Sequence, residues 1–290
     1  MGNLVRQGLA VAGVLVVAAI ALAAWEREDE RATSSETGAT EGRSEVSGEP
    51  GPWSIAADVA RSRRGEVHEK TMVVAAGQTM VLKEEWITFD LDAARIDRAI
   101  VLPERTTGVK ASRERPSLQF RYTADDIYMR RHGIEEQCGA SWAVMPPGLA
   151  AGGAAGVDID PANPLLVEPL AVLGSLDEPG PPVELDKSLR GYKVTVSGGT
   201  GLPLSSAVSK RPGVADRLAA LEHPAWVWLD PDGGRAEVVI DLSAALDVIG
   251  DDLGTGETAG AKLMVAWTIS ERSRVDIDLP EDAASQAECD

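Results

Sequence analysis

The segment Ala225–Leu242, which reads Ala-Trp-Val-Trp-Leu-Asp-Pro-Asp-Gly-Gly-Arg-Ala-Glu-Val-Val-Ile-Asp-Leu, predicts the fold of this chain. Two runs rich in Trp, Val, Ile and Leu flank a short loop of Asp, Pro and Gly. Pro231 presets φ at about −65°, Asp232 can bond its own backbone, and the glycines accept positive φ, so we predict a β-hairpin. Because a lone hairpin is marginally stable in water, we expect other strands to join it in a larger antiparallel sheet.

Alternation of apolar and polar residues recurs along the chain, as is typical of strands with one buried face. We predict strands at Lys70–Ala75, Thr79–Glu84, Glu85–Asp92, Arg95–Leu102, Ser117–Thr123, Asp126–Arg130, Gly191–Ser197, Lys262–Ser270 and Val275–Leu279. We predict helices at Ile55–Ala60, within Pro164–Leu176 with an interruption at Pro169, and within Leu204–Leu221 with a break at Pro212, and loops at Arg131–Asn163 and Asp251–Gly260. Many strands with few helices predict an all-β or α+β domain.

The N-terminus carries an unbroken apolar run, Leu9–Trp25, with Arg6 before it and acidic residues after it. The length of the run and its flanking charges predict an uncleaved membrane anchor in residues 1–25, with the bulk of the chain on the extracytoplasmic side of the membrane. The alternative is a signal segment cleaved near Ala23, after which the protein is secreted. Residues 26–52 are rich in Glu, Ser, Thr and Gly and predict a disordered acidic linker. The folded domain is expected over residues 53–280, and residues 281–290 form an acidic tail.

Charge and residue spacing exclude several classes of function. With Asp+Glu 46 against Lys+Arg 28, the net charge is −18, which repels nucleic-acid backbones. No catalytic motif is found, and the scattered His residues have no metal-ligand spacing, so we expect neither an enzyme nor a bound metal or cofactor. The two cysteines, Cys138 and Cys289, pair in a disulfide or remain free thiols.

A family resemblance follows from the order of several short motifs. These are Asp125-Asp126-Ile127-Tyr128-Met129-Arg130, then Trp142, Pro164-Leu165, Arg190-Gly191-Tyr192, and the Pro224–Gly233 part of the hairpin. In this order the chain resembles the LppX/LprG-type cell-envelope lipoproteins, over Ile55–Pro280. The resemblance implies an α+β, mostly β fold of the LolA/LolB-like type, in which a curved antiparallel half-barrel packs around a few helices and encloses a hydrophobic cavity. Members of the family bind or carry lipids; this chain departs from them because no lipobox cysteine follows its apolar run.

These observations predict a membrane-anchored, extracytoplasmic protein that binds a lipid or other lipophilic envelope molecule without enzymatic activity. The alternative is a ligand-free extracytoplasmic sensor or scaffold that contacts a protein partner. The candidate cavity residues, taken from the alternating apolar positions, are Ile87, Phe89, Leu91, Leu118, Phe120, Tyr122, Val194, Val196 and Val238. Four tryptophans line a ligand cavity or pack in the core and on the sheet, and the sequence leaves both open: Trp142, Trp226, Trp228 and Trp267.

Overall fold

The computed structural model describes residues 52–75, 78–108, 110–131, 139–145, 168–176, 182–183, 190–198, 213–230, 232–253 and 260–285. The predicted membrane anchor and almost all of the acidic linker lie outside these ranges, as do Cys138 and Cys289. Within the described ranges, no helix is long and apolar enough to span a bilayer.

Strands dominate the described chain. They are β1 (Arg64–Ala75), β2 (Gln78–Asp90), β3 (Arg95–Val101), β4 (Leu118–Tyr122), β5 (Ile127–Arg131), β6 (Trp142–Met145), β7 (Pro182–Val183), β8 (Arg190–Ser197), β9 (Glu222–Leu229), β10 (Arg235–Asp241), β11 (Lys262–Glu271) and β12 (Ala283–Ser285). The helices are α2 (Pro52–Ala60), α3 (Glu104–Thr107), α6 (Glu168–Gly174), α8 (Val214–Ala219) and α9 (Ser243–Leu253).

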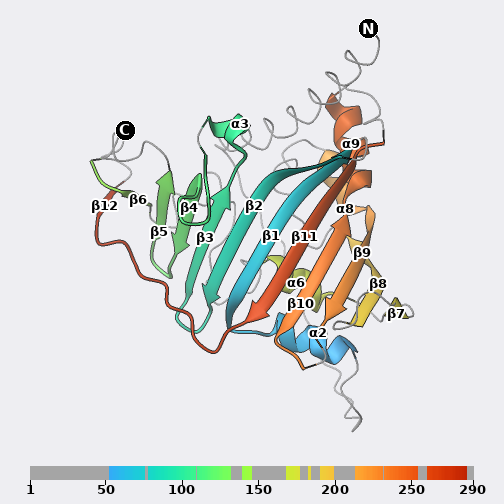
Figure 1. Ribbon diagram of the computed structural model, residues 1–290, viewed down its shortest axis with the longest axis horizontal. Coiled ribbons are helices and arrows are strands. Elements are labelled where there is room, and N and C mark those ends of the chain that lie inside the picture. Colours follow the sequence, from blue (N-terminus) through green and yellow to red (C-terminus); the bar gives the residue numbers. More distant parts are fainter. Residues whose placement is uncertain are drawn as a thin grey trace.

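All of these strands belong to one sheet in the order β12-β6-β5-β4-β3-β2-β1-β11-β10-β9-β8-β7. The sheet is strongly curved and does not close on itself (Figure 1). Every neighbouring pair is antiparallel except β12 and β6, which run parallel. The chain therefore has a mostly β fold in which one large curved sheet accompanies a few helices.

The hairpin predicted at Ala225–Leu242 is confirmed as β9 and β10. The backbone N–H of Asp230 donates to the carbonyl of Arg235 at 3.1 Å and closes the loop. Gly233 and Gly234 have φ values of 84° and 74°, which side chains rarely allow. The two glycines therefore have the positive φ values that their residue type favours.

Two helices, α2 and α6, pack on the concave face of the sheet. Ile55 and Val59 of α2 and Leu170 and Leu173 of α6 are buried in one core cluster with side chains of β1, β2, β3 and β8 to β11. Helices α8 and α9 contact each other at one end of the sheet (Figure 1). The main core thus lies between the sheet and α2 with α6.

Several predicted boundaries are corrected by the structure. The segments at Thr79–Glu84 and Glu85–Asp92 form one strand, β2, whose alternation shifts at a bulge opposite Thr71 and Met72. Pro169 does not interrupt a helix but occupies the first turn of α6, where its missing N–H costs little. Strand β6 lies inside the predicted loop Arg131–Asn163, and α9 begins before the predicted loop at Asp251.

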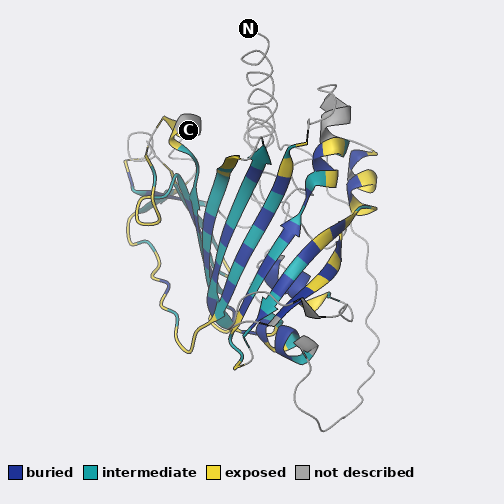
Figure 2. Ribbon diagram, turned by 45° about the vertical axis from the view of Figure 1, so that its right-hand side comes forward, coloured by how far each residue is buried: buried dark blue, intermediate teal, exposed yellow. Residues whose placement is uncertain are grey.

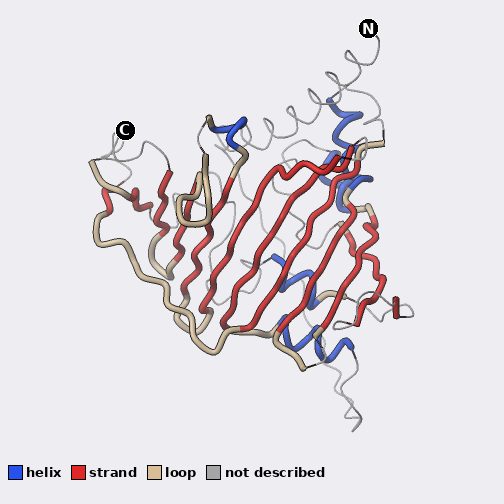
Figure 3. Tube along the Cα trace, viewed as in Figure 1, coloured by secondary structure: helices blue, strands red, loops and turns tan. Residues whose placement is uncertain are grey.

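The predicted strand Val275–Leu279 is wrong. This segment is an extended connection that leads from β11 to β12 along the outside of the sheet (Figure 3). Its backbone carbonyls accept hydrogen bonds from side chains instead of a neighbouring strand, Arg95 donating to Ile277 and Arg121 to Asp278. Alternating apolar residues therefore do not require strand pairing when side chains satisfy the backbone. The last strand, Ala283–Ser285, lies instead within the segment expected to be a tail.

Candidate functional site

The nine candidate cavity residues lie on one face of the sheet. Residues directly opposite each other on neighbouring antiparallel strands point to the same side. The register aligns Phe89 with Ile96 and Tyr122, and Ile87 with Arg98 and Phe120. Leu118, Val194, Val196 and Val238 have the same orientation by the same rule, and Leu91 follows β2 in the same cluster. This is the concave face, which α2 and α6 contact; that it holds a ligand stays a prediction.

The concave face has two apolar parts. Six of the nine residues belong to the core covered by α2 and α6: Ile87, Phe89, Leu91, Val194, Val196 and Val238. The other three belong to a smaller group that we call the β3–β5 cluster, made of Ile100, Leu118, Phe120, Tyr122, Ile127 and Met129. In the helix-covered part these six side chains are buried. In the β3–β5 cluster, Ile100, Leu118, Tyr122 and Met129 are only partly buried. Along the central strands, buried residues alternate with residues of intermediate burial (Figure 2).

A charged network lies on the concave face between these two parts. Lys83 of β2 binds Glu69 of β1 at 2.6 Å and Glu85 of its own strand at 2.8 Å. Arg98 of β3 donates to the second oxygen of Glu85 at 2.6 Å, and the indole N–H of Trp267 donates to Glu69 at 2.9 Å. Glu69 and Glu85 are 2% and 1% exposed, so both carboxylates are buried and fully paired.

The electrostatics of the network keep Lys83 and Glu85 charged. Burial alone would raise the pKa of Glu85, but the nearby charges of Arg98 and Lys83 outweigh it and lower the pKa to about 2. Burial alone would lower the pKa of Lys83, but Glu69 and Glu85 outweigh it and raise the pKa above its ordinary value. General acid–base catalysis requires a pKa near the working pH. Neither Lys83 nor Glu85 meets that requirement at neutral pH.

The sequence prediction missed this network, although a signal was present. Glu85 precedes Ile87 and Phe89 at the same strand spacing, and Arg98 lies between Ile96 and Ile100. A charged residue in phase with apolar neighbours must be buried on the same face as they are. Because a buried charge is costly unless it is paired, two such residues of opposite sign predict a pair. The predicted boundaries separated Lys83 from Glu85 and began the first strand at Lys70, whereas β1 begins at Arg64 and includes Glu69.

The four tryptophans are divided between the two faces. Trp267 is fully buried on the concave face, opposite Val238. The register places Trp226, Trp228 and Trp142 on the opposite face, which we call the convex face. There Trp142 is buried between two guanidinium groups, those of Arg121 and Arg130, 4.8 and 5.0 Å from its ring centre. Of the four, only Trp267 therefore belongs to the face expected to hold a ligand.

No protein-family model and no curated protein matches the chain. Among solved structures, it is similar to a DUF1329 family protein from Desulfovibrio piger, with 8% identity, a TM-score of 0.30, and coverage of 77% of this chain and 93% of that one. It is also similar to a LolA superfamily protein from Nitrosomonas europaea, with 9% identity, a TM-score of 0.25, and coverage of 78% and 94%. In the described part of the chain, no group of His, Cys, Asp or Glu side chains is arranged to hold a metal ion.

Proposed function

We propose that this protein is a membrane-anchored, extracytoplasmic domain that binds a lipid or other lipophilic envelope molecule on the concave face of its sheet. The observation that carries the proposal is the β3–β5 cluster. Four of its apolar side chains are partly exposed to solvent, whereas the six candidate side chains in the helix-covered part of the same face are buried. An acyl chain laid against them would remove that surface from water.

Burial of an acyl chain against the β3–β5 cluster provides enough free energy to bind a lipid. Each buried methylene contributes about 0.8 kcal/mol, so a stretch of about eight carbons contributes roughly 6 kcal/mol before the costs of association. The contact would centre on Leu118, Phe120 and Tyr122, the three candidate residues of the β3–β5 cluster, of which Tyr122 also packs against the helix-covered core. The remaining six candidates pack against the protein's own helices, and we assign them a supporting role.

The non-enzymatic part of the proposal rests on the charged network. Its carboxylates are already paired with Lys83, Arg98 and Trp267, and the pKa values of Lys83 and Glu85 are shifted so that both stay ionised. Such a set orients and neutralises charge but does not exchange protons near pH 7. The extracytoplasmic location rests on the sequence of Leu9–Trp25 and the acidic linker after it.

A ligand-free sensor or scaffold is the second candidate, and one observation favours it. Helices α2 and α6 already fill the concave face over β8 to β11, much as a ligand would. If the β3–β5 cluster is used only to contact a protein partner, the domain needs no lipid. The two candidates therefore differ in what occupies the β3–β5 cluster.

The deciding experiment is native mass spectrometry of the full chain purified from its host, followed by solvent extraction and titration with a fluorescent fatty acid. We expect a stoichiometric lipid mass, and about tenfold weaker fatty-acid binding in Leu118→Asn, because that variant removes about 1.5 kcal/mol of apolar contact. Val144→Asn is the matched control, since Val144 is a partly buried sheet residue on the convex face. An empty protein that takes up no fatty acid would support the sensor or scaffold instead.

A further inference from the structure

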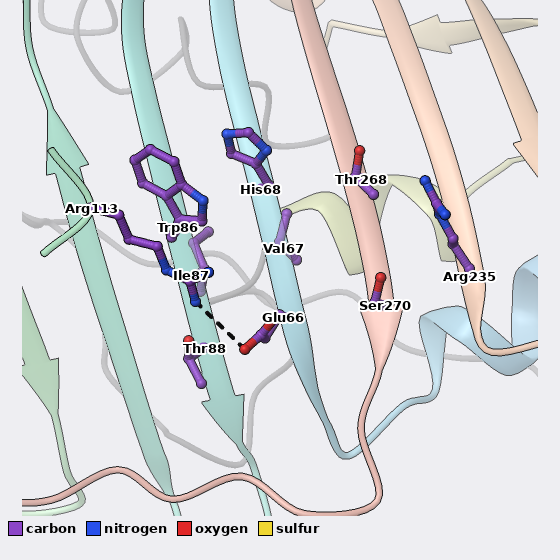
Figure 4. Close-up of a pocket in the computed structure, with 10 residues that line it drawn as sticks. All are labelled: Glu66, Val67, His68, Trp86, Ile87, Thr88, Arg113, Arg235, Thr268 and Ser270. Atoms are coloured by element: carbon purple, nitrogen blue, oxygen red, sulfur yellow. Dashed lines mark ion pairs between the residues drawn. The ribbon is translucent and has the colours of Figure 1, made fainter.

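The convex face carries a hollow of about 360 Å³ that the proposed lipid site does not use (Figure 4). It is lined by Glu66, Val67, His68, Trp86, Ile87, Thr88, Arg113, Arg235, Thr268 and Ser270. These residues come from four neighbouring strands, β2, β1, β11 and β10, and from the loop before β4. The volume is near the lower end for small-molecule sites and admits roughly one or two sugar rings.

One wall of the hollow is aromatic. His68 and Trp86 are directly opposite each other on β1 and β2, and their rings stack at 4.7 Å with 9° between the planes. Arg113 reaches over Trp86, 6.0 Å from the ring centre, and pairs with Glu66 at 3.6 Å. The stacked rings and the guanidinium of Arg113 together form this wall of the hollow.

The rest of the lining offers unpaired hydrogen-bonding groups. Among the described residues, the hydroxyls of Thr88, Thr268 and Ser270 and the indole N–H of Trp86 have no hydrogen-bond partner. Each hydroxyl can both donate and accept. Figure 4 shows Thr268 and Ser270 on the side of the hollow opposite Trp86, so a ligand between them would meet polar groups from both sides.

The charges in the hollow select against simple ions. Glu66 lies within it and is also paired with Arg272 at 3.2 Å, so an anion would meet a carboxylate. Arg113 and Arg235 line its two sides, so a cation would meet guanidinium groups. A neutral ligand with many hydroxyls avoids both penalties, because its hydroxyls donate to Glu66 and accept from the arginines.

We propose that this hollow binds a neutral saccharide, with its sugar hydroxyls shared among Glu66, Thr268, Ser270 and the two arginines. A second site of this kind, on the face opposite the lipid site, would let the protein bind an envelope polysaccharide and a lipophilic molecule together. The register places the side chains of two lining residues, Val67 and Ile87, on the concave face, and the other lining strand residues point to the convex face.

The test is calorimetric titration of the full chain in lauryldimethylamine oxide, a detergent without a sugar headgroup. The ligands are soluble tetrasaccharides of glucose, galactose, mannose and arabinose, with glucuronate and inorganic phosphate as anionic comparisons. We expect one tetrasaccharide to bind with a millimolar or lower Kd and the anions not to bind. We expect the double variant Thr268→Val, Ser270→Ala to weaken that binding about tenfold, since it removes two neutral hydrogen bonds.

The matched control is Thr195→Val, an exposed β8 residue on the same face outside the hollow, which should leave saccharide binding unchanged. Fatty-acid binding should be unchanged in both variants, which separates this site from the concave face. The proposal is overturned if no tetrasaccharide binds, or if the double variant binds as tightly as the unaltered chain. It is also overturned if phosphate or glucuronate binds the unaltered chain more tightly than every tetrasaccharide, since the hollow is then an anion site.

Discussion

Replacement of Glu85 by Gln should destabilise the protein strongly, and by an amount that depends on pH. The fall in the pKa of Glu85 from its ordinary 4.5 to about 2 corresponds to about 3 kcal/mol at neutral pH, at about 1.4 kcal/mol for each factor of ten. Because the variant also leaves Lys83 and Arg98 short of a partner, the whole loss should reach roughly 3–5 kcal/mol.

The sign of the pH dependence follows from the direction of the shift. A carboxylate whose pKa is lower in the folded protein stabilises the fold above its unfolded pKa, and that stabilisation is lost as the pH falls toward the folded pKa. The unaltered protein should therefore lose about 2–3 kcal/mol from this group between pH 4.5 and pH 2. Glu85→Gln should lack this component, so the two proteins should become more alike in stability as the solution is acidified.

The assay is urea unfolding at pH 7, 5 and 3, followed by tryptophan fluorescence, since Trp267 adjoins the network. Glu237→Gln is the control, because Glu237 pairs with Arg235 on the convex face, where both side chains are partly exposed and such a pair contributes about 0–1 kcal/mol. A loss below about 1 kcal/mol for Glu85→Gln at pH 7, or an equal loss at pH 7 and pH 3, would refute the assignment of a buried, ionised Glu85.

Three further outcomes are expected, each measured by the same urea unfolding. Gly65→Ala should cost about 1–3 kcal/mol, because the new Cβ would lie 2.6 Å from the backbone carbonyl oxygen of Ser270 and 2.7 Å from the ring of Phe89; no loss would mean that both the β11 backbone and the ring move aside. Trp267→Phe should cost about 2–3 kcal/mol, since it leaves Glu69 without its indole donor; a loss that persists in the Glu69→Gln background would place the effect in packing instead. Burial lowers the pKa of His223, so stability should fall as the pH drops below about 6.5, and His223→Leu should flatten that slope between pH 7.5 and 5.5.

Most strands were predictable because a half-buried strand repeats every two residues. Period-2 alternation located β3, β4, β5, β8 and β11 to within a residue or two at each end. The same period assigned Phe89, Phe120 and Val238 to one side of their strands, and the register places all three on the concave face. The failures occurred where alternation lacked a partner strand, as at Val275–Leu279, and where too few residues pair to show a period, as in β6 and β12.

The hairpin, most of the strands and the face to which their apolar side chains point follow from turn chemistry and local periodicity, so they could be read from the chain alone. Which strands become neighbours depends on the folded sheet, since alternation along one strand carries no information about the strand that pairs with it. For that reason the full charged network could not be predicted from the sequence. Glu69, Glu85 and Arg98 come together only when β1, β2 and β3 pair in one register. The convex hollow depends on the same pairing, because its lining comes from four strands and a loop that are far apart in the sequence.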